Sequence, residues 1–165
     1  MSRFQPHLIF AFILSFAFAL NASAAEDAKY VKIVNVNTGK VLAVTDDSDD
    51  AGARAVLAKD EPNQARQWQL VKDGNSLKIV NRKTGKVLDV NEASKDEGAE
   101  VIQWDEKTDD NDNQRWSWDG AGDERRLKAK HSGLVLDANA DGKVIQKKAD
   151  EKSKSQLWRA VEVKD

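Results

Sequence analysis

The side chains most able to do chemistry in this sequence are carboxylates, which gather in two acidic runs. "TDDSDD" spans residues 45–50, and "TDDNDN" spans residues 108–113. Carboxylate and amide oxygens are the hard ligands that calcium prefers. Neither run has the glycine and the terminal glutamate that a calcium-binding hairpin loop needs at fixed offsets. We therefore interpret both runs as solvated loops and expect no metal site.

Catalytic side chains are scarce. The sequence contains no cysteine, so it has no thiol nucleophile and no thiolate metal ligand. Outside the N-terminal apolar segment the only histidine is His131, which lies at the start of a turn where a structural role is expected. No Ser-His-Asp arrangement can be assembled, and nothing marks two carboxylates as a catalytic pair. The sequence predicts neither an enzyme nor a cofactor.

The chain repeats itself three times. "VKIVNVNTGKVLAV" (31–44) matches "LKIVNRKTGKVLDV" (77–90) and the shorter "LKAKHSGLVLDA" (127–138). A second phrase ends in tryptophan: "NQARQW" at Trp68, "NDNQRW" at Trp116 and "SKSQLW" at Trp158. A fixed period of this kind is typical of repeat architectures. We place the units roughly at 29–73, 74–122 and 123–165.

Each unit is predicted to contain about four short strands. In the second unit "LKIVN" alternates apolar and polar residues, "KTG" supplies a turn, and "KVLDV", "AEVIQW" and "QRWSW" are further extended stretches. No helical periodicity is evident. Twelve strands in three equal units must protect their sheet edges. A propeller is disfavoured because three blades are too few, and a closed three-fold barrel, the β-trefoil, fits the count.

The N-terminus is predicted to be a signal peptide covering residues 1–24. Arg3 precedes an apolar run at 8–20, and Ala22-Ser23-Ala24 forms a small-residue cleavage signal. Cleavage after Ala24 would leave one domain, 25–165, that is secreted or periplasmic; an uncleaved membrane anchor is the alternative. Without Arg3, 25 basic residues face 28 acidic ones. Nucleic acid is therefore not an expected partner, and neither is a membrane after cleavage.

The phrases "NQRW" and "SQLW", each after a strand ending in "VLD", resemble the Gln-x-Trp repeats of ricin B-chain-type lectin domains. The resemblance covers essentially all of 25–165. It implies that Trp68, Trp116 and Trp158 pack inward around a pseudo-three-fold axis, and that Gln114 and Gln156 tie down the local backbone. Two residues after Trp116, Trp118 shares its strand face, so we expect it in the core as well.

The resemblance also implies a sugar pocket in the second repeat, formed by Asp89, Trp104, Asn113 and Gln114. In this family an aspartate accepts hydrogen bonds from two sugar hydroxyls, an aromatic stacks on the C–H face, and an asparagine binds another hydroxyl. The chemistry is reasonable, because an ionised carboxylate makes strong hydrogen bonds. Ile102 departs from the family, which often has a glutamine there.

The other two repeats are poorer candidates. The first has Ala43, Ala58 and Arg66 at the aspartate, aromatic and glutamine positions, so no pocket is expected. The third keeps Asp137 and Gln156 as weak site candidates. Its aromatic and asparagine positions hold Lys147 and Ser155, and lysine offers no stacking plane.

The sequence thus predicts a secreted, all-β module that binds a glycan without catalysis. Galactose-like and xylan-like glycans are both implied by the resemblance, and the residues do not choose between them or set an oligomeric state. A second interpretation remains open, in which the trefoil is a non-lectin interaction or protease-inhibitor protein with eroded sugar sites. Asp89 would then only accept a backbone N–H in a turn.

Overall fold

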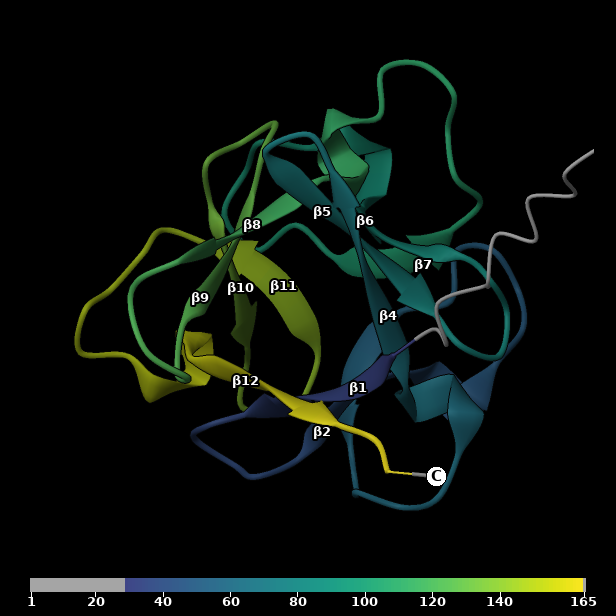
Figure 1. The fold of residues 1–165 in the computed structure, drawn as a ribbon. Helices are drawn as coiled ribbons and strands as arrows, with labels where there is room; N and C mark the ends of the chain where they lie inside the picture. The colour runs from purple at the N-terminus through teal and green to yellow at the C-terminus, as the bar shows by residue number, and fades with distance from the viewer. Residues whose placement is uncertain (1–28, 165) are drawn as a thin grey trace, which may run out of the picture.

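The computed structural model describes residues 29–164, so the signal peptide predicted over 1–24 lies outside the described part (Figure 1). The strands are β1 (Tyr30–Asn35), β2 (Val41–Val44), β3 (Ala55–Ala58), β4 (Trp68–Asp73), β5 (Ser76–Asn81), β6 (Val87–Val90), β7 (Val101–Trp104), β8 (Trp116–Asp119), β9 (Arg126–Ala129), β10 (Val135–Ala138), β11 (Val144–Lys147) and β12 (Trp158–Glu162). Short 3-10 turns occur at Thr45–Asp47, Gln64–Arg66, Asn91–Ala93, Asp112–Gln114 and Lys154–Gln156. Over residues 29–164 no helix is long and apolar enough to cross a bilayer.

Six strands close into an antiparallel ring in the order β1–β4–β5–β8–β9–β12. The last join, between β9 and β12, is made by the backbones of Arg125 and Trp158, whose two N···O distances are 2.8 and 3.1 Å. β12 then pairs with β1 along five residues, and the two strands lie side by side in Figure 1. Closure leaves no free edge in the ring, and exposed edges are what sheets must avoid.

The other six strands form three hairpins, β2–β3, β6–β7 and β10–β11, over one end of the ring. Each hairpin contacts both of the others through single bridges: Arg54 with Ile102, Glu100 with Ile145, and Val56 with Lys143. Three sets of four strands, with a six-stranded barrel and a triangular hairpin cap, make a β-trefoil. The all-β fold class and the trefoil predicted from the repeats are confirmed.

The recurring tryptophans lie at the centre of the molecule. Trp68, Trp116 and Trp158 begin β4, β8 and β12, and each is 0% exposed. Their indole N–H groups donate to the backbone oxygens of Leu42, Leu88 and Leu136 in the cap, at 2.9, 3.1 and 3.0 Å. A buried indole needs such an acceptor. The three residues therefore fill the barrel and join it to the cap.

Trp118 lies at the edge of this core rather than inside it. Its ring is partly buried and packs against the buried cluster. The guanidinium of Arg125 lies 4.6 Å from the ring centroid. Trp118 shares a strand face with Trp116, but it is two residues nearer the exposed β8–β9 loop and lines a surface cavity.

Candidate functional site

The hairpin register places Asp89 and Trp104 on one face. Asp89 in β6 pairs with Ile102 in β7, and Val87 pairs with Trp104. Alternate residues of a strand point to the same side. Asp89, Ile102 and Trp104 accordingly line one cavity of about 300 Å³, whose other walls are Asn91, Glu92 and Lys107.

Two buried amides hold the Asp89 carboxylate. Asn113 Nδ2 donates to Oδ1 at 2.8 Å, and Gln114 Nε2 donates to Oδ2 at 2.8 Å. Both amides are positioned by the 3-10 turn Asp112–Gln114, which ends one residue before β8 begins. A carboxylate oxygen can accept two hydrogen bonds. Each oxygen of Asp89 therefore keeps acceptor capacity for a ligand, although the residue is only 2% exposed.

Asn113 and Gln114 lie behind the carboxylate, and neither lines the cavity. The second Nδ2 hydrogen of Asn113 goes to the Val90 oxygen at 2.9 Å, and that of Gln114 Nε2 goes to the Asp105 oxygen at 3.0 Å. All their amide hydrogens are thus engaged within the protein. The structure brings the four expected residues together, but these two position Asp89, and their N–H groups are not free for a sugar hydroxyl.

Lys107 is a member of the site that sequence reasoning missed. Its Nζ donates to Asn113 Oδ1 at 3.0 Å and lies 3.8 Å from Asp89 Oδ2. It belongs to the loop between β7 and β8, where no repeated pattern singles it out. Lys107 places a cationic donor beside the acceptor.

Burial raises the pKa of Asp89 above its ordinary value, because desolvation penalises the charged form. Hydrogen bonds from Gln114 and Asn113 and the charges of Lys107 and His131 lower the pKa of the same group without cancelling the effect of burial.

Trp104 supplies an apolar surface open to solvent. Its side chain is 41% exposed, whereas most other large apolar residues of the domain are buried or partly buried. Ile102, where the family often has glutamine, is buried at the cavity wall. The site therefore combines an oriented carboxylate, a cationic donor and a flat ring.

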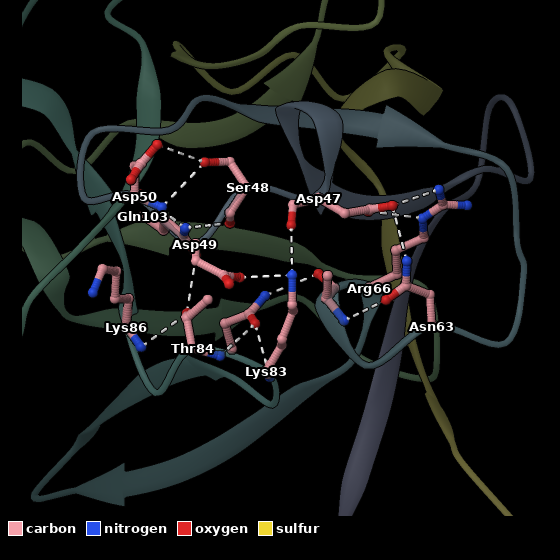
Figure 2. Close-up of polar contacts among 12 residues, drawn as sticks. Asp47, Ser48, Asp49, Asp50, Asn63, Arg66, Lys83, Thr84, Lys86 and Gln103 are labelled. Atoms are coloured by element: carbon pink, nitrogen blue, oxygen red, sulfur yellow. Dashed lines mark hydrogen bonds and ion pairs between the residues drawn. The ribbon is translucent and has the colours of Figure 1, made fainter.

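The first repeat has an ion pair where the second has a pocket. Arg66 replaces the glutamine and reaches Asp47, with Nε to Oδ1 at 3.1 Å and Nη2 to Oδ2 at 2.9 Å (Figure 2). A further nitrogen of Arg66 pairs with Glu61 at 2.9 Å. With Ala43 and Ala58 at the other two positions, this repeat has neither acceptor nor ring.

Figure 2 also shows how the acidic run at 45–50 is used. Asp47 accepts from Asn63 at 2.8 Å, and Asp49 pairs with Lys83 at 2.7 Å. Asp50 accepts from the Ser48 hydroxyl at 3.2 Å. Within residues 29–164 no group of three metal-ligating side chains is found. The Asp49–Lys83 pair therefore joins the first repeat to the second, and the other two contacts lie within the first repeat.

The third repeat keeps half of the arrangement. Gln156 Nε2 donates to Asp137 Oδ2 at 3.1 Å, but Asp137 Oδ1 is buried without a hydrogen-bond partner among the described residues. Ser155 stands where the second repeat has Asn113, and its side chain bonds Ser153 instead. Lys147 at the aromatic position is exposed. The weak candidates Asp137 and Gln156 thus lie together without a stacking surface.

Known proteins share this fold. A family model described as "Ricin-type beta-trefoil lectin domain-like" matches residues 15–104. No curated protein sequence matches the chain. The designed 3-fold symmetric protein ThreeFoil is 35% identical, with 81% of this chain and 99% of that chain covered and a TM-score of 0.76.

Two further solved structures are similar. The exo-β-1,3-galactanase 1,3Gal43A from Clostridium thermocellum is 36% identical, with 84% of this chain but 31% of that chain covered and a TM-score of 0.75. The Polyporus squamosus lectin is 19% identical over 79% of this chain and 48% of that chain, with a TM-score of 0.68, which supports the fold alone. Because the family model covers more than half of the 165 residues, the chain belongs to the ricin-type β-trefoil lectin domain-like family.

Proposed function

We propose that this protein is a non-catalytic carbohydrate-binding module with one sugar pocket, in its second repeat. The observation that supports this most strongly is a carboxylate held by two amides, in the same cavity as an exposed indole. Asp89 accepts hydrogen bonds from two sugar hydroxyls, and Trp104 stacks on the C–H face of the ring. Lys107 donates to a sugar oxygen.

The pocket is small, and we expect its affinity for a single sugar to be low. About 300 Å³ is at the lower end of ligand pockets and suits a single sugar ring. One shallow site of this kind gives a dissociation constant of about 1 mM, roughly −4 kcal/mol. Useful binding then comes from several contacts at once, on a polymeric glycan or in an oligomer.

Both galactose-like and xylan-like glycans fit this chemistry. A β-galactan is the first ligand to test, because a 36% identical relative is an exo-β-1,3-galactanase. The signal peptide proposed for residues 1–24 would deliver the module outside the cytoplasm, where such polymers occur.

A glycan array tests the proposal directly. Wild-type protein should bind galactose-containing or xylose-containing glycans, and Trp104→Ala should weaken binding by about fivefold to tenfold, since an aromatic contact contributes roughly 1 to 1.4 kcal/mol. Lys147→Ala is the matched control, because Lys147 occupies the equivalent position of the third repeat. If wild-type protein binds no glycan at millimolar concentration, the lectin function is rejected and the non-lectin interaction role takes its place.

Binding should also depend on pH through Asp89. The raised pKa of this carboxyl means that it becomes protonated at a higher pH than an ordinary aspartate, whose pKa is about 3.9. Protonation removes the charge that strengthens the hydrogen bonds to the sugar. We expect affinity, measured by titration calorimetry, to be full at neutral pH and to fall on acidification with a midpoint above that value. A His131→Gln variant should show the same loss; if it removes the loss, protonation of Asp89 is not the cause.

A further inference from the structure

We propose that the first repeat positions the indole of Trp104, with Gln103 and Gly52 as positioning residues for sugar stacking. This inference rests on the function proposed above. The sugar site would then be built from two repeats, and the first repeat, which has lost its own pocket, would support the pocket of the second.

Gln103 fastens the first-repeat loop to the strand that carries Trp104. It is 0% exposed, and Nε2 donates to the backbone oxygens of Ser48 at 2.8 Å and Asp50 at 2.9 Å (Figure 2). Its Oε1 accepts from the Thr84 hydroxyl at 3.1 Å. Neighbouring residues of a strand point to opposite sides. Gln103 therefore holds the loop from the side away from the cavity.

Gly52 belongs to the same loop and lies beside the indole. Its N–H donates to the Gln103 oxygen at 2.8 Å, and Gln103 N–H donates to the Ala53 oxygen at 2.9 Å. A Cβ atom placed on Gly52 would lie 3.4 Å from Cζ3 of Trp104. The loop thus lies beside the six-membered ring, and a methyl group at Gly52 would be in van der Waals contact with it.

The third repeat has the same fastening without a ring to support. Gln146 Nε2 donates to the Ser94 and Asp96 oxygens at 2.7 and 3.0 Å, and Gly98 N–H donates to the Gln146 oxygen at 2.8 Å. A Cβ atom on Gly98 would meet nothing within 4 Å. The residue after Gln146 is Lys147, which has no aromatic ring. In the third repeat the fastening therefore joins two repeats but has no ring beside it.

This internal copy supplies matched controls. Leucine occupies the glutamine position in the first repeat as Leu57, so Gln103→Leu and Gln146→Leu are both compatible with the hairpin. Gly52 and Gly98 have nearly equal φ angles of +88° and +85°, so alanine strains both backbones alike. Within each pair the main difference is therefore the presence of the indole.

Two readouts separate positioning from general stability. The first is the indole N–H signal of Trp104 in the sugar-free protein, followed by NMR and assigned with Trp104→Phe. The second is the affinity for the glycan that the array identifies. Gln103→Leu and Gly52→Ala should shift or broaden the Trp104 signal and weaken binding by about tenfold, as expected when a stacking contact is lost. Gln146→Leu and Gly98→Ala should lower the melting temperature similarly and change neither readout.

An unmoved Trp104 signal in Gln103→Leu and Gly52→Ala would overturn the inference, as would an equal loss of affinity in the control variants. If the wild-type protein binds no sugar, the proposed function fails, yet the sugar-free indole signal still decides whether the first repeat positions the ring.

Discussion

Replacing Asp89 with alanine is expected to abolish measurable glycan binding while the protein remains folded. The change removes the acceptor of two sugar hydroxyls, and a hydrogen bond to a charged group contributes about 1.5–3 kcal/mol. Losing two of them lowers affinity by roughly a hundredfold or more, because each 1.4 kcal/mol is a factor of about ten. Titration calorimetry against the best array ligand measures the loss. This is the largest effect on binding that we expect from any single residue.

Replacing Asp89 with alanine also changes folding stability, through one destabilising and one stabilising effect. Asn113 and Gln114 lose the acceptor at 2.8 Å from each amide, and an unsatisfied buried donor costs about 1–3 kcal/mol. Removing a buried carboxylate also relieves its desolvation, which is the cause of its raised pKa. Asp137→Ala is the matched control and should leave sugar affinity unchanged. Undiminished binding by a folded Asp89→Ala protein would show that the sugar binds elsewhere.

Trp116→Ala should produce the largest loss of folding stability. The side chain is 0% exposed, and its indole N–H donates to the Leu88 oxygen at 3.1 Å. Truncating a buried tryptophan typically costs about 3–5 kcal/mol, a large share of the roughly 5–15 kcal/mol that stabilises most domains. Chemical denaturation followed by circular dichroism gives the free energy of unfolding.

Trp118→Ala is the comparison for this prediction, because Trp118 is on the same strand but only partly buried. Its free energy of unfolding should fall by clearly less. Equal losses for the two variants would mean that burial of Trp116 does not explain its contribution.

The fold could be predicted from the sequence because each repeat encodes the same local structure. The strands β2 and β6 begin at the valines of the "GKVL" stretches, and the tryptophan phrases end at the first residues of β4, β8 and β12. Residues that alternate along a strand have predictable directions, so an inward role for Trp68, Trp116 and Trp158 could be expected. The partial burial of Trp118 could not, since it depends on how neighbouring strands and loops surround that residue in space.

Only part of the site could be predicted from the sequence. Asp89 and Trp104 could be identified from the family resemblance, but their common face depends on a hairpin register that pairs Asp89 with Ile102. That Asn113 gives both amide hydrogens to the protein follows from three-dimensional contacts alone. Lys107 lies in a loop and Gly52 lies in another repeat, so neither could be assigned to the site from the sequence. For Gln103 a signal existed, the shared "VIQ" of the second and third repeats.

The join between β1 and β12 has a consequence for how the chain reaches its native state. Val31 lies opposite Glu162, so the ring is completed by the first and last strands of the domain. Contacts between residues so distant in sequence raise the contact order and slow folding, because a long loop must close before they form. During synthesis on the ribosome, the edge of β1 that pairs with β12 therefore stays unpaired until β12 has emerged.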